Sequence, residues 1–173
     1  RLLIKITGWP RIGFLKEIFP KAKFIHMLRD GRAVANSLLN VDFWQGWQGP
    51  QNWRWGPLSP AQRHDWLAFD RSFLALAALQ WRIMMDATEE AKRLVKETDY
   101  VELKYETLCS RPVDVSEQII NFCGLGWTPT FQALVQRYPI KNTNYKWEEN
   151  LTPAQQTTLK TVLSEYLERY GYD

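Results

Sequence analysis

Two side chains that suit anion binding, Arg29 and Ser37, stand on either side of a turn signal in the sequence. A guanidinium fork and a hydroxyl both donate hydrogen bonds readily to a phosphate. The apolar run Phe24 to Leu28 before them is short and uninterrupted, which is typical of a strand covered on both faces. Asp30-Gly31 then indicates a turn, with Asp30 as the N-cap of a helix whose free N–H groups attract an anion. The spacing predicts a phosphate site at the carboxyl end of this strand, or, as the plain alternative, an Arg29 that pairs with a carboxylate.

The elements that must position this motif alternate along the chain. Apolar runs predict three strands, at residues 2–6, 23–28 and 100–104. Apolar stripes and capping signals predict helices at residues 12–19, 32–40, 70–97, 112–122, 128–138 and 153–170, with Asp70 capping the third of them. A polar loop is expected over residues 142–150. Strands separated by helices favour an α/β fold with a parallel sheet.

Residues 42–69 interrupt this pattern with five tryptophans, at positions 44, 47, 53, 55 and 66. A loop of this length in a compact domain is usually functional or a lid. Aromatic walls bind sugars, phenols and hydrophobic chains, so the segment is expected to be a lid or insert over an acceptor site. A packed hydrophobic lid explains the same composition.

The bulk composition is that of a globular protein. The chain has 173 residues, of which 45% are hydrophobic and 24% charged, enough for a single domain over residues 1–173. Its net charge of +3 suits a small anionic ligand and is too low to indicate nucleic acid. Cys109 and Cys123 have no metal-ligand spacing, and no apolar run is long enough to span a membrane.

Arg29-Asp30-Gly31-Arg32 with Ser37 resembles the 3′-phosphate-binding motif of sulfotransferases that use 3′-phosphoadenylyl sulfate (PAPS). The glycine after the aspartate resembles the tyrosylprotein and bacterial branches of the family. The resemblance implies a three-layer parallel sheet flanked by helices, the P-loop NTPase-like sulfotransferase fold. It also implies that Arg29 and Ser37 hold the 3′-phosphate of PAPS or of its product, adenosine 3′,5′-bisphosphate (PAP).

Lys5, in Lys5-Ile6-Thr7, is similar to the family lysine that stabilises charge on the leaving phosphate oxygen. A lysine at a strand end that reaches for water is the alternative. The cytosolic branch has a catalytic histidine where this chain has Thr7, so the general base is not assigned. His64 is a weak candidate for the general base.

Three further segments resemble the nucleotide-binding parts of the family. Tyr105, in a Tyr-Glu-x-Leu pattern, corresponds to the tyrosine that contacts the adenine. Asn142, Thr143 and Lys146 correspond to a loop that closes over the 3′-phosphate and ribose. A solvated loop and a packed tyrosine are the structural alternatives. No metal is expected, because the chain has no ligand cluster and the family needs none.

The glycine-rich phosphate loop that begins the family fold has no counterpart here. The resemblance therefore implies a C-terminal portion that lacks the N-terminal part, holds the 3′ end of the nucleotide, and is nearly inactive by itself. We also expect an exposed apolar sheet edge that invites self-association.

The expected function is transfer of a sulfuryl group from PAPS to a hydroxyl or amine acceptor. Two alternatives stay open: a P-loop-type nucleotide kinase, and a non-catalytic module that binds a nucleotide or a protein. The sequence names neither the acceptor nor the cellular compartment.

Overall fold

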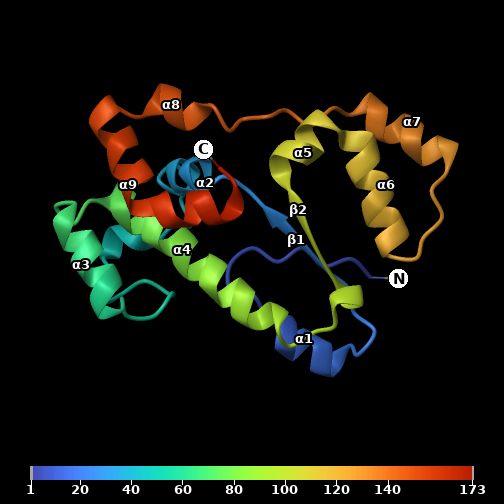
Figure 1. The fold of residues 1–173 in the computed structure, drawn as a ribbon, viewed down its shortest axis with the longest axis horizontal. Helices are drawn as coiled ribbons and strands as arrows, with labels where there is room; N and C mark the ends of the chain where they lie inside the picture. The colour runs from blue at the N-terminus through green and yellow to red at the C-terminus, as the bar shows by residue number, and fades with distance from the viewer. Residues whose placement is uncertain (1, 173) are drawn as a thin grey trace. The chain divides into compact units, whose positions relative to one another are not determined.

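A computed structural model describes residues 2–172 of the chain, which form helices and a small parallel sheet (Figure 1). Its internal contacts define two compact units, each of which is described by itself. The first unit comprises the segments up to Pro10, from Asp30 to Glu89 and from Asn144 onward; the second comprises Arg11–Arg29 and Glu90–Thr143. The predicted fold class, an α/β fold with a parallel sheet flanked by helices, is confirmed.

The second unit is built on two parallel strands, β1 (Phe24–Leu28) and β2 (Tyr100–Lys104). Their register pairs Phe24 with Tyr100 and Leu28 with Lys104, so both strands end at the same edge of the sheet. Parallel strands need a long crossover connection, which the intervening chain provides. The other elements of this unit are the helices α1 (Ile12–Ile18), α5 (Tyr105–Ser110), α6 (Pro112–Phe122) and α7 (Pro129–Arg137), and the short 3₁₀ turn η2 (Glu97–Asp99).

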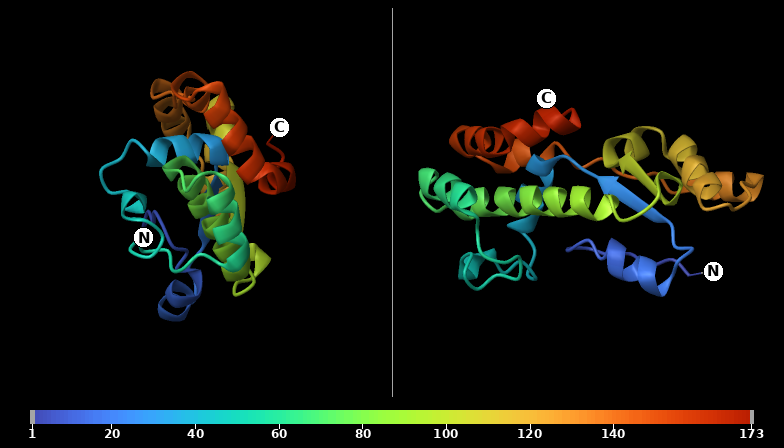
Figure 2. Two further views of the ribbon diagram at one scale, coloured as in Figure 1. Left: turned by 90° about the vertical axis from the view of Figure 1, so that its left-hand side faces the viewer. Right: turned by 60° about the horizontal axis from the view of Figure 1, so that its bottom comes forward.

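The first unit is helical. Its elements are α2 (Gly31–Leu38), the 3₁₀ turn η1 (Gly46–Gln48), α3 (Pro60–Ala68), most of α4 (Phe73–Lys92), α8 (Lys146–Asn150) and α9 (Pro153–Tyr170). The views in Figure 2 agree that α9 lies along α4. Residues 74–81 of α4 are all buried, as expected of a helix that is covered on every side.

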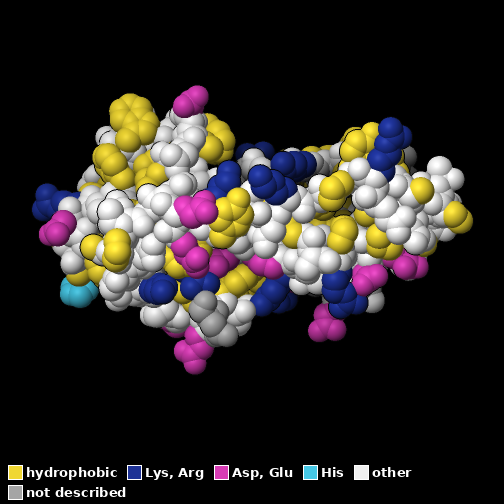
Figure 3. Space-filling view, turned by 90° about the horizontal axis from the view of Figure 1, so that it is seen from above, with side chains coloured by type: hydrophobic (Ala, Val, Ile, Leu, Met, Phe, Trp, Pro, Cys, Tyr) yellow, Lys and Arg dark blue, Asp and Glu magenta, His cyan; other side chains and the backbone are white. Residues whose placement is uncertain are grey.

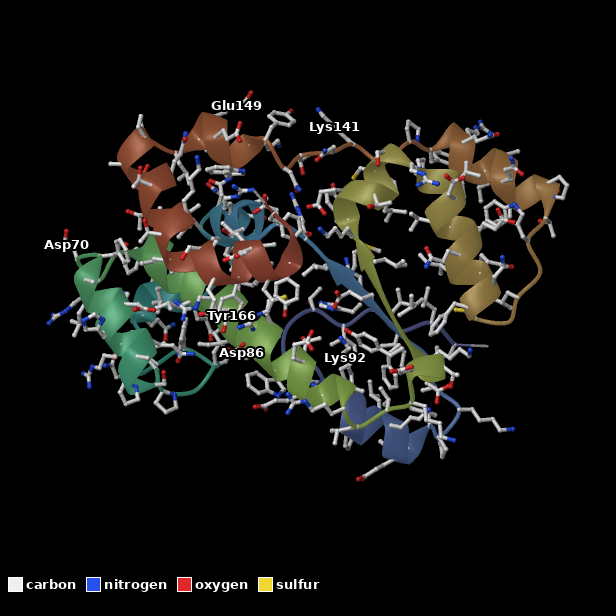
Figure 4. All side chains as sticks on the ribbon, in the orientation of Figure 1. Asp70, Asp86, Lys92, Lys141, Glu149 and Tyr166 are labelled. Atoms are coloured by element: carbon white, nitrogen blue, oxygen red, sulfur yellow. The ribbon has the colours of Figure 1, made fainter. Side chains whose placement is uncertain are left out.

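Half-buried polar contacts beside this apolar core join α4 and α9. The Tyr166 hydroxyl donates to both carboxylate oxygens of Asp86 at 2.6 Å, and Figure 4 shows the two side chains side by side. Burial and this hydrogen bond raise the pKa of Tyr166 to about 12. Arg82 of α4 contacts two helices, because its Nη1 donates to Asp65 of α3 at 2.7 Å and to the Val162 carbonyl of α9 at 3.2 Å.

Gly31 allows α2 to begin directly against α4. A Cβ built on Gly31 would lie 2.7 Å from the Trp81 indole, closer than van der Waals contact allows. Trp81 in turn packs edge-on against Tyr166 and Tyr170 of α9. The glycine of the turn motif therefore fixes the approach of α2 to the core of the first unit.

Two predicted elements are wrong. Residues 2–6 form no strand and are exposed along their whole length, because an apolar run becomes a strand only where a neighbouring strand supplies its hydrogen bonds. Asp70 does not cap the long helix: it has a positive φ of 52°, and α4 begins later, where the Ser72 hydroxyl accepts the Ala75 N–H at 3.2 Å. The helix also ends earlier than expected, at Lys92.

The tryptophan-rich segment is more ordered than its composition predicts. It contains η1 and α3, and α3 begins with a capping box between Ser59 and Gln62. Trp44 is buried and donates its indole N–H to Gln80 at 2.8 Å, whereas Trp47 is 62% exposed. One part of the segment is thus core, and another presents an aromatic surface.

Candidate functional site

Arg29 and Tyr105 directly follow the paired ends of β1 and β2 in the second unit. The guanidinium carbon of Arg29 lies 4.5 Å from the centroid of the Tyr105 ring, a cation–π contact. The carboxyl ends of parallel strands are where open α/β sheets bind ligands. The parallel register thus brings two of the predicted site residues together at the edge where a ligand is expected.

Thr143 joins this pair from a segment far along the chain. Nη2 of Arg29 donates to Oγ1 of Thr143 at 3.1 Å, and the Tyr105 hydroxyl donates to the Lys141 carbonyl at 2.9 Å. Asn142, between these two anchored positions, is exposed. We name Arg29, Tyr105 and Thr143 the guanidinium cluster. A cationic fork held by a ring and a hydroxyl fits the donor set that a phosphate requires.

The Tyr105 hydroxyl stays protonated well above neutral pH. Burial raises its pKa, and a hydrogen bond with the Cys109 side chain adds to the effect. The protonated hydroxyl can therefore donate its hydrogen bond to the Lys141 carbonyl. The link between the end of β2 and the 141–143 segment is therefore stable to pH across the neutral range.

Asp30, the next residue after Arg29, caps α2 in the first unit. Its Oδ1 accepts the backbone N–H of Arg32 at 2.8 Å, as predicted for an N-cap. The same carboxylate binds the Arg32 guanidinium, with Nη2 to Oδ2 at 2.8 Å and Nε at 3.1 Å from both oxygens. The Asp30 carboxylate thus pairs with Arg32.

The remaining predicted residues, Ser37, Lys146 and Lys5, belong to the first unit. Ser37 is exposed in the last two turns of α2, and Lys146 is exposed as the first residue of α8. Lys5 lies in the extended segment that forms no strand, so it does not stand at a strand end as expected. The loop expected over 142–150 is in part helical, because α8 occupies residues 146–150.

From the sequence, no role was assigned to Arg32 or to Trp147. The Arg32 guanidinium carbon lies 4.9 Å from the Trp147 ring centroid, and both side chains are buried. They form one wall of a pocket of about 450 Å³, which Lys160, Leu167 and Tyr172 also line. No local sequence signal links Arg32 to Trp147, which are 115 positions apart in the chain.

The two histidines of the chain differ in their surroundings. His26 lies within β1, where its Nδ1 is 3.0 Å from Oε2 of Glu102 on the paired strand. His64 has a side chain that is 84% exposed and lies 3.8 Å from Asp65. In the same residues, no group of three or more His, Cys, Asp and Glu is arranged to hold a metal ion.

The described surface carries charges of both signs. Figure 3 shows lysines and arginines interspersed with acidic and hydrophobic side chains on the face seen from above. No helix between residues 2 and 172 is long and apolar enough to cross a membrane.

Comparison with solved structures identifies a sulfotransferase with a similar fold. The crystal structure of sulfotransferase STF9 from Mycobacterium avium matches with a TM-score of 0.55 and 21% sequence identity, over 92% of this chain and 39% of that one. This likeness concerns the fold.

Curated relatives of known activity share sequence with most of the chain. The omega-hydroxy-beta-dihydromenaquinone-9 sulfotransferase Stf3 of Mycobacterium tuberculosis is 27% identical over 164 residues, which are 94% of this chain and 39% of the relative. The protein-tyrosine sulfotransferase A of Caenorhabditis elegans is 24% identical over 114 residues, which are 66% of this chain and 24% of the relative. The chain spans about two fifths or less of the length of these relatives.

A sequence profile of the sulfotransferase family matches residues 7–129, a range that contains Arg29, Ser37 and Tyr105. The match covers well over half of the chain and agrees with the fold and with both relatives. The chain therefore belongs to the sulfotransferase family.

Proposed function

We propose that this chain carries the 3′-nucleotide-binding part of a sulfotransferase that uses PAPS. The observation that supports this most is the guanidinium cluster, in which Arg29, Tyr105 and Thr143 meet at the carboxyl ends of two parallel strands. A guanidinium that is oriented before the ligand arrives binds a phosphate at a lower cost in side-chain entropy.

Within this proposal, Arg29 binds the 3′-phosphate, and Ser37 and Lys146 supply a hydroxyl and a second positive charge. Tyr105 contacts the adenine and, together with Thr143, orients the Arg29 fork. Asn142 contacts the ribose. Lys5 is the proposed stabiliser of the leaving phosphate oxygen. The orienting role of Tyr105 and Thr143 rests on their contacts with Arg29, and the other roles follow the family motifs that the residues match.

Bound PAPS supplies a sulfuryl group, whose sulfur bonds to the acceptor oxygen as its bond to the phosphate oxygen breaks. The acceptor loses its proton, and the products are a sulfate ester and PAP. We propose a hydroxyl acceptor, because the names of both relatives specify hydroxyl-bearing acceptors, an omega-hydroxy menaquinone and a protein tyrosine.

Calorimetric titration of the chain with PAP and with 5′-AMP tests the 3′-phosphate site. We expect PAP to bind more tightly than 5′-AMP by a factor of about 10 to 100, the range for one charge-assisted phosphate contact. Arg29→Ala and Ser37→Ala are expected to remove this preference while 5′-AMP binding changes little.

Matched controls are available on the same chain. Arg137 is an exposed arginine that also lies over a tyrosine ring, 5.7 Å from Tyr138, and Ser164 is an exposed helical serine. Arg137→Ala and Ser164→Ala should leave PAP binding unchanged. Equal affinities for PAP and 5′-AMP in the unaltered chain would contradict the proposed site.

A further inference from the structure

Arg32 connects the start of α2 with α8 in the first unit. One side of its guanidinium is bound to the Asp30 carboxylate by Nε and Nη2, and its carbon lies 4.9 Å from the Trp147 ring centroid. Arg32 is 8% exposed and Trp147 3% exposed. A charge-assisted pair and a desolvated cation–π contact thus meet on one side chain, where both are strong.

The helix α8, which carries Trp147, depends on contacts with neighbouring helices for its stability. α8 has five residues, and isolated helices of that length are unstable in water. From α9, the Gln156 side-chain amide donates to the Glu148 carbonyl at 2.8 Å and to the Leu151 carbonyl at 3.0 Å. On the α2 side, the contact between Arg32 and Trp147 is the corresponding anchor. Removing it should loosen α8.

We propose that Arg32 is a positioning residue, which fixes the backbone position of Lys146 by holding its neighbour Trp147. The proposal rests on the proposed function, because it assigns a ligand to Lys146. Lys146 immediately precedes Trp147 and is exposed, so its ammonium group is placed by the backbone that Trp147 anchors.

The two arginines of the turn motif therefore have different tasks. Arg29 leaves the end of β1 and presents its fork in the guanidinium cluster. Arg32 has Nε and Nη2 engaged by Asp30 and its carbon over an indole, an arrangement that holds protein rather than ligand. A lysine in place of Arg32 keeps the positive charge but loses the planar guanidinium group that binds Asp30 with two nitrogens.

Hydrogen exchange measured by mass spectrometry tests the anchor without any ligand. Arg32→Lys and Trp147→Leu are expected to raise amide exchange in residues 146–151 by about fivefold or more, in line with losing one cation–π contact. Trp147→Phe retains an aromatic face and should restore most of the protection. Arg169→Lys is the matched control, because Arg169 is an exposed arginine 4.7 Å from the Tyr166 ring in α9.

A double-mutant cycle on PAP affinity tests whether Arg32 acts through Lys146. If it does, Arg32→Lys and Lys146→Ala each weaken PAP binding by about fivefold or more, and the double variant binds no more weakly than Lys146→Ala. Binding of 5′-AMP should change less than twofold in all three variants. If the losses of PAP affinity caused by Arg32→Lys and by Lys146→Ala multiply in the double variant, the proposal is overturned.

The two measurements separate this inference from the proposed function. Unchanged exchange in both Arg32→Lys and Trp147→Leu overturns the anchor, whatever the nucleotide affinities are. Equal affinities of the unaltered chain for PAP and 5′-AMP overturn the proposed 3′-phosphate site, and with it the role given to Lys146. Raised exchange together with non-additive PAP affinities supports the inference.

Discussion

The guanidinium carbon of Arg29 lies 4.5 Å from the centroid of the Tyr105 ring, on residues that follow two paired strand ends. The family resemblance assigns Tyr105 to the adenine, and the geometry adds a second task to its ring. One region of that ring is in contact with a guanidinium, and its hydroxyl is bound to the 141–143 segment. Tyr105 can therefore affect phosphate binding through the orientation of Arg29.

Substitutions of Tyr105 separate the contribution of the ring from that of the hydroxyl. Tyr105→Phe keeps the cation–π surface and loses one exposed hydrogen bond, so we expect PAP affinity to fall by less than about fivefold. Tyr105→Ala removes both and should weaken binding by about tenfold or more. Calorimetric titration with PAP measures both effects, and a Tyr105→Ala variant that binds like the unaltered chain would show that the ring has no role.

Gly31→Ala is expected to destabilise the first unit. The added Cβ would lie 2.7 Å from the Trp81 indole, a rigid ring that also packs against two tyrosines, so it cannot yield easily. Overpacking of this kind costs about 1–3 kcal/mol. Urea unfolding followed by circular dichroism measures the loss.

Gly126→Ala is the control for this substitution, because a Cβ at Gly126 would meet no atom within 4 Å. Its stability should stay within about 0.5 kcal/mol of the unaltered chain. If Gly31→Ala is as stable as Gly126→Ala, the close approach of α2 to Trp81 is not required by the fold.

The sequence predicted the elements whose signals are local. The strand at 100–104 and the helix at 112–122 occur at the predicted bounds, since an apolar run and an N-terminal proline define them. Residues 2–6 carry an equally strong apolar signal and form no strand, because strand formation depends on a partner that local sequence does not encode. The short α5 and α8 were missed, since their stability comes from tertiary contacts.

The same distinction applies to the site. Arg29, Tyr105 and Thr143 were predicted by motif. The contact of Arg29 with Tyr105 follows from a parallel register that joins strands over 70 residues apart, whereas Thr143 reaches Arg29 from a third segment. The pairing of Arg32 with Trp147 depends on how α2 and α8 pack, and neither residue carries a local signal for the other. Motifs thus identified the residue types, and packing determined which of them meet.

Acid is expected to weaken the sheet through Glu102. The hydrogen bond from His26 on the paired strand lowers the pKa of Glu102 below its ordinary value near 4.5. A carboxyl with a lowered pKa in the folded state stabilises the fold at pH above that ordinary value, and the contribution is lost as the pH falls through the folded pKa. Glu102→Gln should therefore cost about 1 kcal/mol at pH 7 and progressively less below pH 4.5.

Urea unfolding of both proteins between pH 3 and pH 7 measures this dependence. The difference in unfolding free energy between the unaltered chain and Glu102→Gln should shrink as the pH falls. Glu90→Gln serves as the control, because Glu90 is exposed on α4 and forms no ion pair within residues 2–172. A difference that stays constant over this range would mean that the hydrogen bond between His26 and Glu102 contributes nothing.

Leu3→Lys is expected to reduce self-association of the chain. Leu3 is 87% exposed in a segment, residues 2–6, whose other apolar side chains are also exposed. Exposed apolar chain with unpaired backbone groups can pair with a second copy, and a lysine disfavours such pairing through its charge.

Sedimentation velocity between about 5 and 100 μM, the range in which weak homodimers form, should detect a concentration-dependent species that Leu3→Lys diminishes. Lys21→Glu, a charge change at an exposed turn residue outside this segment, should leave it unaltered. A monomer at every concentration would refute the expected association, because the exposed apolar surface would then be insufficient to join two copies.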